Sequence, residues 1–419
     1  MALLSIPAIG RSDVVQDWNA IMQDTVSSQP PFPQARLAAI TQLAVFEAVN
    51  AITRQYKPYL GTVKGDGGAS PEAAAIASAH AVLKNYFPAS AASLDALEVS
   101  SLAAIPNGPA KAAGIDIGEA AAAAMIAARA NDGSAPPAFF LPTSSEPGQW
   151  QLTPGCTAAG GAFFHWQNVT PFGIPSASQF HLDPPPPLNS ERYTRAFNEV
   201  KEVGDINSTA RPQDRTNVAV FYASITPVRV FNGAARQISA AQGKSLAENA
   251  RDFALINMAI ADAAVATFYT KYLYKFWRPE TAIHNAGADG NDRTQPDAAF
   301  MPLIVTPCFP GYPSAHGTLS NAARAIMEQV YGDGPFSITV MAAGMTLNYT
   351  SLTQITDDIS DARVYGGIHF RTDQDAGEAL GAASANTFTR TIYGRRMATV
   401  LINDSQASSR PGRSRVECR

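Results

Sequence analysis

Apolar residues recur every three or four positions through most of the chain, a spacing that places them on one face of an α-helix. Residues 115–131 carry this helical pattern and are rich in small residues, which predicts close packing against another helix. Ser70 followed by Pro71 is typical of a helix start, because serine caps the first turn and proline suits its first position. In the first third of the sequence the pattern predicts helices over residues 12–26, 33–52, 70–87 and 115–131.

The helical pattern returns in the second half of the chain. Its longest stretch covers residues 245–277, and two further helices are predicted after Ser314 and after Gln374. Alternating apolar and polar positions, which would indicate strands, are few. The sequence therefore predicts an all-α fold built from helical bundles.

A proline-rich segment separates the two helical regions. Residues 131–190 hold eleven of the thirty prolines, including Pro184 to Pro187, and are predicted to be largely loop. A loop of this length is uncommon in a compact domain unless it shapes a site or wraps the surface. We expect an N-terminal helical region at 1–190, a C-terminal helical bundle at 191–404 and a polar tail at 405–419, with the two regions packed as one two-bundle unit.

Composition and charge narrow the class of partner. The 419 residues carry a formal net charge of −4, and 16% of them are charged, which argues against a general surface for nucleic acid or anionic membrane. We find no uninterrupted apolar run of transmembrane length. The first thirteen residues lack a basic region and their apolar run is cut by Pro7, unlike a signal peptide. Any anion site must therefore be a local cluster of cations.

Cysteine is scarce in this chain. Cys156, Cys308 and Cys418 are too few for a disulfide scaffold or a cysteine-rich zinc site. One bridge could form and would leave one thiol over. Nothing in the spacing requires a bridge, so we expect none.

Two cations lie at the end of the long predicted helix. Lys271 and Arg278 are seven residues apart, so both project from one helical face two turns apart. Pro279 then stops or bends the helix. No matching carboxylate lies between the two cations, which is unusual. A solvated basic face is the alternative interpretation of this segment.

The stretch FPGYPSAHGT begins as a turn punctuated by Pro and Gly and continues as an amphipathic helix. A helix start offers unpaired N–H groups and a partial positive charge, which attract anions. Ser314 adds a hydroxyl, Ala315 a backbone N–H, and His316 an imidazole that can donate or accept a proton. The alternative is that Ser314 only caps the helix and His316 packs beneath a loop.

A third segment follows some fifty residues later. Arg363 and His369 flank Gly366 and Gly367, two glycines that would let the backbone approach a ligand closely. Asp373 lies four residues after His369, so on a helix the two share a face and the carboxylate could fix the imidazole tautomer. An exposed arginine and a His–Asp pair on a helix surface would be the structural alternative.

Taken together, the three segments describe a site for a tetrahedral oxyanion. Three cations, one hydroxyl, a helix N-terminus and two imidazoles occur within about a hundred residues. One imidazole could attack or coordinate the central atom in line, while the other gives a proton to the opposite oxygen.

This order of residues resembles the superfamily of vanadium-dependent haloperoxidases and type-2 phosphatidic acid phosphatases. The match covers about a quarter of the chain, and the first fifty residues also look like bacterial proteins classed with the haloperoxidases. Ala315 replaces the usual glycine and Ala362 the usual serine, changes that remove no charge and no imidazole. The matching residues are Lys271, Arg278 and Pro279 for the motif Lys-x6-Arg-Pro, Pro313 to His316 for Pro-Ser-Gly-His, and Arg363, Gly367, His369 and Asp373 for Ser-Arg-x3-Gly-x-His-x3-Asp.

The resemblance implies how the anion would be bound. Lys271, Arg278 and Arg363 would neutralise the equatorial oxygens of vanadate or phosphate. The hydroxyl of Ser314 and the backbone N–H of Ala315 would assist them. Vanadate is the cofactor that the resemblance implies, with phosphate as its analogue or as a substrate group.

The resemblance also implies chemical roles. His369 would be the ligand to the vanadium of vanadate, or the nucleophile that forms a phosphohistidine, and Asp373 would orient it. His316 would act as general acid–base. Phe309 lies where fungal chloroperoxidases carry an aromatic residue near the halide site, and His284 follows the first motif closely enough to support the site from behind.

Two enzyme activities share these motifs, because vanadate is a structural analogue of phosphate. A haloperoxidase would oxidise a halide with hydrogen peroxide, whereas an acid phosphatase would hydrolyse a phosphomonoester. About 270 residues precede the first motif, as in the two-bundle haloperoxidases, so we favour the first activity. A phosphate- or sulfate-binding protein without turnover would not need both imidazoles. By resemblance we also expect export to the periplasm or the medium.

Overall fold

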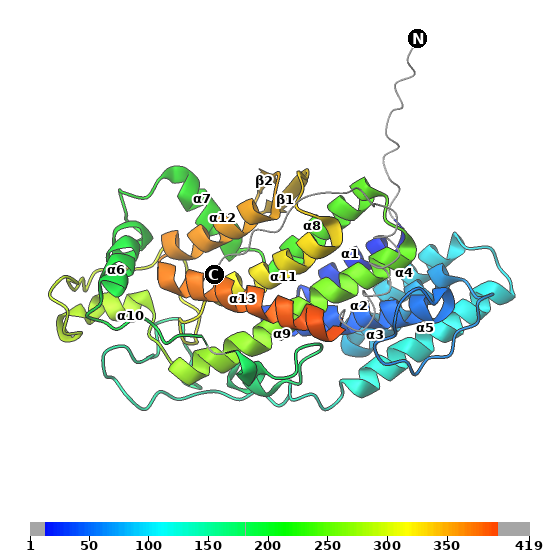
Figure 1. Ribbon diagram of the computed structural model, residues 1–419, viewed down its shortest axis with the longest axis horizontal. Helices are drawn as coiled ribbons and strands as arrows, with labels where there is room; N and C mark the ends of the chain where they lie inside the picture. The colour runs from blue at the N-terminus through cyan, green and yellow to red at the C-terminus, as the bar shows by residue number, and fades with distance from the viewer. Residues whose placement is uncertain (1–12, 181, 393–419) are drawn as a thin grey trace, which may run out of the picture.

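The computed structural model describes residues 13–180 and 182–392 (Figure 1). The first twelve residues and the predicted polar tail at 405–419 lie outside this described part. Within it the fold is all-α, as predicted, with a single short hairpin. The α-helices are α1 (Val14–Val26), α2 (Pro31–Thr53), α3 (Pro71–Tyr86), α4 (Ala91–Ala103), α5 (Pro109–Ala128), α6 (Glu191–Gly204), α7 (Gln213–Ala223), α8 (Pro227–Gln242), α9 (Leu246–Tyr274), α10 (Pro279–His284), α11 (Ala315–Tyr331), α12 (Leu352–Tyr365) and α13 (Arg371–Ile392).

Local capping signals set the starts of the first helices. The Asp13 carboxylate accepts hydrogen bonds from the backbone N–H groups of Val15 and Gln16 and caps α1. The Ser70 hydroxyl accepts from the Ala73 N–H at 3.1 Å, and Pro71 is the first residue of α3. The predicted helix start at Ser70 is confirmed, because each side chain satisfies an N–H that the first turn leaves unpaired.

Glycines bring α5 close to α3 in the N-terminal region. A Cβ on Gly118 would lie 2.5 Å from the carbonyl oxygen of Ala74, and one on Gly114 would lie 2.4 Å from that of Ser70. No side chain fits in that space. The small residues of this helix therefore serve close helix packing, as the sequence predicted.

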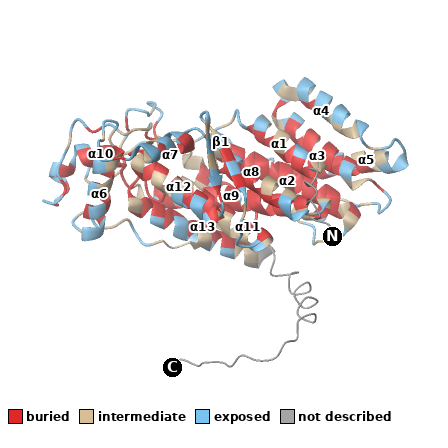
Figure 2. Ribbon diagram, turned by 90° about the horizontal axis from the view of Figure 1, so that it is seen from above, coloured by how far each residue is buried: buried red, intermediate tan, exposed pale blue. Residues whose placement is uncertain are grey.

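The long helix α9 crosses the middle of the molecule and packs against helices of both halves, among them α2 and α11 (Figure 1). It begins with a capping box in which Ser245 and Glu248 bond each other's backbone N–H. It ends at Lys275, whose left-handed backbone (φ 49°) stops the helix. Buried residues concentrate along α9 and its neighbours α2 and α8 (Figure 2). The helix is therefore the central support of the fold.

Two helices, α2 and α9, are long and apolar enough to cross a membrane by length and composition alone. Isolated polar residues, such as Gln42 in α2 and Asp262 in α9, interrupt both runs, so neither is an uninterrupted apolar run of transmembrane length. In both helices 94% of the apolar window is buried inside the protein. Core helices have this environment, since their apolar residues are covered by neighbouring helices.

The C-terminal region is held by the pairing of α11 with α13. A Cβ on Gly381 would lie 2.4 Å from the carbonyl oxygen of Thr318, and one on Gly377 would lie 2.7 Å from that of Ser314. The backbone N–H of Ser314 also donates to the carbonyl of Asp373 at 2.8 Å. The starts of both helices are thereby fixed side by side.

One β-hairpin lies on the surface between α11 and α12. Strand β1 (Ile338–Ala342) pairs antiparallel with β2 (Met345–Tyr349), and Ile338 faces Tyr349. The connecting residues Ala343 and Gly344 both have positive φ, as a tight two-residue hairpin turn requires.

The proline-rich segment is mostly irregular, as predicted, with two short 3₁₀ turns at Phe164–Asn168 and Ala177–Gln179. Its attachment to the core is polar. The buried carboxylate of Asp262 on α9 accepts three backbone N–H bonds from residues 172–174. Arg36 forms an ion pair with Asp132 at 2.7 Å. The segment is thus bound to the helices at several points.

A disulfide links this segment to the second half of the chain, so the expectation of no bridge was wrong. Cys156 is bonded to Cys308, 152 residues later. Sequence spacing gave no indication because only the path of the proline-rich segment brings the two cysteines together.

One hydrophobic cluster runs from Val15 in α1 to Phe388 in α13 and so includes both helical regions. The domain boundary at residue 190 stays a prediction.

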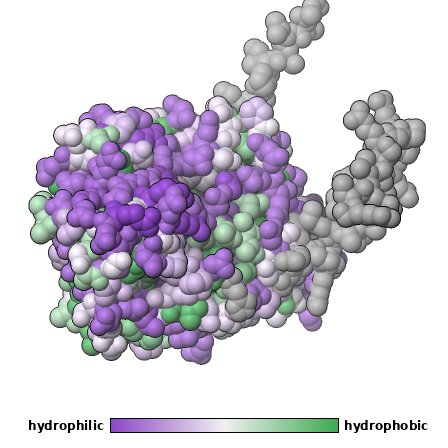
Figure 3. All heavy atoms as spheres, turned by 60° about the vertical axis from the view of Figure 1, so that its left-hand side comes forward, coloured by the Kyte–Doolittle hydropathy of each residue, from purple (hydrophilic) through white to green (hydrophobic). Residues whose placement is uncertain are grey.

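The end of the molecule near α6 and α10 has a largely hydrophilic surface with smaller apolar patches (Figure 3).

We predict that Gly381→Ala lowers the free energy of unfolding by about 2 kcal/mol or more, because the added methyl overlaps the backbone of α11. Denaturant unfolding followed by circular dichroism measures this. Gly233→Ala on α8 is the matched control, since its Cβ would have open space. Alanine is the better helix former, so the control should be neutral or stabilising by up to about 1 kcal/mol. Equal effects of the two substitutions would contradict this account.

Candidate anion-binding active site

The predicted site residues come from four helix ends that meet in the C-terminal region (Figure 1). The end of α9 and the turn after it provide two cations, and the end of α12 provides the third. The start of α11 provides the hydroxyl and one imidazole. The start of α13 provides the second imidazole and its carboxylate. The residues are Lys271, Arg278, Ser314, Ala315, His316, Arg363, His369 and Asp373.

The three cations are buried without a carboxylate at ion-pair distance among the described residues. Lys271 and Arg278 are 0% exposed and Arg363 is 3% exposed. Burial lowers the pKa of Arg278 to about 9 and that of Arg363 to about 10. Burial, followed by the charge of Arg278, also lowers the pKa of Lys271 well below its usual value. A cluster of this kind strongly favours a bound anion, because buried charge is costly unless it is paired.

Three consecutive backbone carbonyls orient two of these cations. The Lys271 ammonium donates to the carbonyls of Pro310 and Gly311 at 2.7 and 2.8 Å. The Arg278 Nε donates to the carbonyl of Phe309 at 2.9 Å. We call residues 309–311 the carbonyl clamp. Because carbonyls carry no net charge, the clamp fixes the directions of the cations and leaves their positive charge uncompensated.

The Phe309 ring contributes to the same arrangement. The Lys271 Nζ lies 5.2 Å and the Arg278 guanidinium carbon 5.1 Å from the centre of the ring. Both contacts are within the range of cation–π attraction. Phe309 therefore joins the site through its ring as well as through its carbonyl.

Two guanidinium donors of the site are buried without a hydrogen-bond partner among the described residues. Arg278 Nη2 and Arg363 Nε have none, although Arg363 Nη1 donates to the Tyr222 carbonyl at 3.0 Å. Unpaired buried donors are rare in folded proteins. Guanidinium groups match the oxygens of tetrahedral anions well. The residues present thus fit a vanadate or phosphate group.

Hydrogen bonding fixes the tautomer of His369. Its Nε2 lies 2.9 Å from Arg278 Nη1, and its Nδ1 lies 2.9 Å from Asp373 Oδ2. An arginine can only donate, so Nε2 must be the acceptor and Nδ1 must carry the proton. The lone pair of Nε2 therefore points toward Arg278, among the cations.

Asp373 holds this tautomer from a fully buried position. Its Oδ2 also accepts from the Phe370 N–H at 3.1 Å, whereas Oδ1 has no partner. Burial raises the pKa of Asp373 to about 7, against the opposing effect of Lys271 and Arg278. Asp373 is the one carboxylate whose charge acts on both these cations.

The start of α11 contributes the groups predicted from its sequence. Ser314 caps the helix by accepting from the Gly317 N–H at 3.2 Å, and its side chain is fully buried. Ala315 is the first helical residue. Capping and anion binding are therefore compatible roles here, because a hydroxyl that accepts one hydrogen bond can still donate another.

His316 follows in the first turn of α11 and is half-buried. Its pKa is lowered well below the usual value, first by burial and then by the charges of Arg363, Lys271 and Arg278. A neutral imidazole beside a cationic cluster can accept a proton. The same charges, with His316 itself, act on His369, so the two imidazoles lie in one electrostatic environment.

His284 lies away from this cluster. It is exposed at the end of the short helix α10 and donates from Nε2 to the carbonyl of Phe300 at 2.8 Å. Its hydrogen-bond partner belongs to the loop beyond α10 rather than to the anion site.

The glycines of the third motif face protein backbone, not a ligand. A Cβ on Gly367 would lie 2.4 Å from the carbonyl oxygen of Gly204, and one on Gly366 would lie 2.6 Å from that of Ala362. Gly367 also has φ +79°, a conformation that L residues rarely adopt. Their expected approach to a ligand is thus corrected, because they allow the turn between α12 and α13 to pack.

Sequence reasoning missed the carbonyl clamp and the disulfide beside it. Backbone carbonyls have no side-chain signature, and the only local signal was the Pro and Gly content of residues 309–313. Both features depend on which distant segments of the chain lie side by side in the folded protein.

Comparison with known proteins relates the helices that carry these residues to a known family. Residues 251–393 match the family model of the VCPO second helical-bundle domain. The vanadium chloroperoxidase of Curvularia inaequalis is 26% identical over 183 residues, which cover 37% of this chain and 30% of that protein. The chain thus aligns with less than a third of the length of this relative.

Solved structures extend the likeness to nearly the whole fold. The first bacterial vanadium-dependent iodoperoxidase superposes with a TM-score of 0.77 at 24% identity, over 90% of this chain and 96% of that one. An apo-type bacterial vanadium-dependent chloroperoxidase gives 0.71 at 16% identity, over 89% and 95%. The resemblance to the haloperoxidase superfamily is confirmed, by sequence over the second bundle and by fold over most of the chain.

We predict that Asp373→Ala weakens the preference of His369 for the Nδ1–H tautomer, because only Arg278 Nη1 then bonds the ring. Asp373→Asn preserves it, because its amide oxygen can still accept from Nδ1–H. Nitrogen-15 NMR of histidine-labelled protein distinguishes the two tautomers. His284 serves as internal control. An unchanged His369 spectrum in Asp373→Ala would show that this carboxylate does not set the tautomer.

Proposed function

We propose that this protein is a vanadium-dependent haloperoxidase that oxidises a halide with hydrogen peroxide. One observation carries the proposal: three buried cations, with no carboxylate at ion-pair distance among the described residues, act on His369, and its Nε2 lone pair points to Arg278. The cluster lies within a fold shared with bacterial vanadium-dependent haloperoxidases. Vanadate, when bound, would supply the activation of peroxide for two-electron oxidation of the halide.

The cations would hold the oxygens of this group. Lys271, Arg278 and Arg363 supply the positive charge, and Arg278 Nη2 and Arg363 Nε supply the donors that now have no partner. Ser314 and the Ala315 N–H would add hydrogen bonds from the start of α11. These donors are fixed before binding, so little reorganisation opposes it.

His369 would be the ligand to the central atom through Nε2. Its proton sits on Nδ1, toward Asp373, so the lone pair needed for this bond is available at neutral pH. Arg278 Nη1, the present partner of Nε2, would then donate to an anion oxygen. Asp373 acts as the orienting residue and stabilises any positive charge that develops on the ring.

His316 would act as general acid–base toward the hydrogen peroxide substrate. Burial, followed by the surrounding positive charge, lowers the pKa of His316 and favours its neutral form, which can accept a proton as a general base. Its partly exposed position at the helix start allows exchange of that proton with solvent.

Phe309 is the candidate aromatic group near the halide. Its ring lies against both Lys271 and Arg278, so the positive charges of these two side chains would attract an anion beside the ring. The solved structures of this fold include both an iodoperoxidase and a chloroperoxidase, so halide choice must depend on side chains near the site and not on the fold.

The alternative activity is hydrolysis of a phosphomonoester through a phosphohistidine on His369. The same neutral Nε2 and the same cations would serve it, and His316 would protonate the leaving oxygen. We favour the haloperoxidase because the likeness to haloperoxidase structures includes the N-terminal helices. A binding protein without turnover remains disfavoured, since it would not need both imidazoles.

We predict bromination of a phenolic reporter by hydrogen peroxide and bromide only after addition of vanadate, and its loss in His369→Ala. Parallel hydrolysis of an aryl phosphate measures the alternative. Arg195→Ala, which alters an exposed ion pair on α6, is the control and should leave activity unchanged. Phosphatase activity without bromination would contradict the haloperoxidase proposal and support the phosphatase alternative. A vanadate-soaked crystal without anion density beside His369 would show that this is not an anion site.

We also predict that His316→Ala separates chemistry from binding. Turnover should fall by about 10²- to 10⁴-fold, the usual contribution of a general acid–base, whereas vanadate affinity should change little because His316 holds none of the cations. Steady-state kinetics and calorimetric titration of vanadate test both parts. An equal loss of affinity would make His316 a binding residue.

A further inference from the structure

We propose that the Cys156–Cys308 disulfide is a positioning element that sets the anion affinity of the site by holding the carbonyl clamp. This inference rests on the proposed function. It concerns two residues that match none of the superfamily motifs in this sequence.

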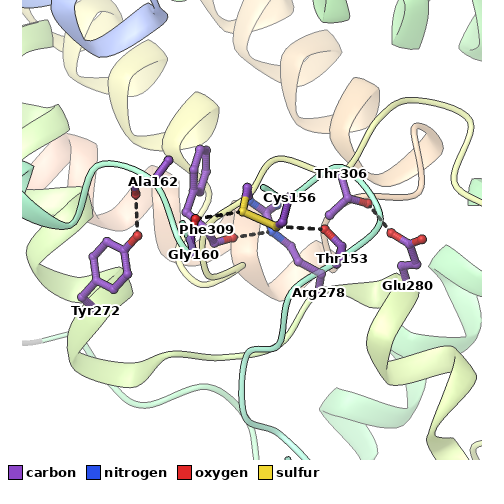
Figure 4. The surroundings of a disulfide bond; sticks show 10 residues. Thr153, Cys156, Gly160, Ala162, Tyr272, Arg278, Glu280, Thr306 and Phe309 are labelled. Carbon is purple, nitrogen blue, oxygen red and sulfur yellow. Dashed lines mark hydrogen bonds between the residues drawn. A yellow bond between two sulfur atoms is a disulfide. The ribbon is translucent and has the colours of Figure 1, made fainter. Parts of the chain in front are cut away.

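The bridge lies directly beside the clamp in the chain. Cys308 precedes Phe309, the first clamp residue, whose carbonyl accepts from Arg278. Pro310 and Gly311 follow and bind Lys271. Figure 4 shows the disulfide next to Phe309 and the Arg278 side chain. A displacement at Cys308 would therefore reach both cations through one to three peptide units.

The other end of the bridge is itself anchored to the core. Cys156 lies in the proline-rich segment, and the Tyr272 hydroxyl, one residue after Lys271 on α9, donates to the carbonyl of Ala162 in the same segment (Figure 4). The Ala162 N–H in turn donates to the Cys308 carbonyl at 2.8 Å. The disulfide thus joins the clamp to a segment that is bound to the helix carrying Lys271.

The clamp has other contacts besides the bridge. The Phe309 ring packs against Phe32, Phe163 and Phe268. Thr306 donates to Glu280 on α10 at 2.8 Å, and the Gly311 N–H donates to the Phe276 carbonyl at 2.9 Å. Between these two points, the Ala162 bond and the bridge tie residues 307–310 to the proline-rich segment. The bridge is the one covalent restraint on this stretch apart from the chain itself.

Reduction would loosen the clamp. A dithiol reductant transfers two electrons and two protons to the bridge, which gives two thiols, and the reductant becomes a disulfide. Cys156 and Cys308 are both only partly buried, so a small dithiol can reach them. The clamp carbonyls would then be free to move, the cations would lose their fixed directions, and anion affinity would fall because preorganisation is lost.

The link between the bridge and anion affinity has a consequence for the cellular compartment in which the site can work. Disulfides form in oxidising compartments and are kept reduced in the cytosol. The site gains its full anion affinity only where the bridge can form. This agrees with the export expected from the superfamily resemblance.

The test compares anion affinity in oxidised wild type, in reduced wild type and in the double variant Cys156→Ser/Cys308→Ser. Calorimetric titration with inorganic phosphate gives the affinity, since phosphate, unlike vanadate, is not reduced by thiols. We expect the dissociation constant to rise about tenfold or more on loss of the bridge, and to recover when reduced wild type is reoxidised. Far-UV circular dichroism checks that each sample is folded.

Two controls separate positioning from general destabilisation. Cys418→Ser removes a thiol without touching the bridge and should bind phosphate as wild type does. His80→Ala breaks the contacts of His80 on α3 with Asp95 and Glu98 on α4, at the other end of the molecule (Figure 1), so it should lower Tm and leave affinity unchanged. A fall in affinity in His80→Ala equal to that in the double variant would assign the effect to stability alone.

The outcomes are distinct. Affinities of reduced wild type and double variant within about twofold of the oxidised protein, less than 0.5 kcal/mol, would overturn the inference and leave the proposed function standing. If oxidised wild type binds neither phosphate nor vanadate, the proposed function fails and the inference with it. If the double variant does not fold, protein reduced after folding decides the question.

Discussion

The feature on which the site depends is the burial of three positive charges around one neutral imidazole. Lys271, Arg278 and Arg363 have no carboxylate at ion-pair distance in the described part of the chain, and only Asp373 acts on the first two from behind His369. Such a cluster is costly in a folded protein. A bound oxyanion would offset that cost, and the buried donors of Arg278 and Arg363 without partners are consistent with the proposed anion site.

The rest of the fold supplies what this cluster needs to remain in place. Helix α9 is capped at its start, stopped at Lys275 and covered by both bundles, so Lys271 projects from a rigid support. Glycines on α13 bring it close to α11, so that the Ser314 cap and Asp373 share a hydrogen bond. The carbonyl clamp then orients the cations without neutralising them. Each of these contacts fixes the position or orientation of a charged or polar side chain without neutralising the positive charge of the cluster.

Side chains of the site could be predicted from sequence, whereas its backbone could not. Lys271, Arg278, Ser314, His316, Arg363, His369 and Asp373 carry chemistry at informative spacings, and the structure brings them together. The helices were predictable because buried faces impose a regular apolar period. The clamp at 309–311, the turn role of Gly367 and the Cys156–Cys308 bridge depend on which distant segments meet. His284 follows the first motif closely in sequence, but in the structure it is exposed at the end of α10 and bonds the carbonyl of Phe300.

The choice between a resident cofactor and a passing substrate group depends on rigidity more than on charge. A phosphatase must release its product in every cycle, so very tight binding of phosphate would slow it. A cofactor site gains from the opposite property, because an anion lost from the site removes activity. Here fixed cations, a capped helix start, a fixed tautomer and a disulfide beside the clamp all lower the cost of binding before the anion arrives. That degree of preorganisation is the physical reason to favour vanadate as a resident group over phosphate as a transient one.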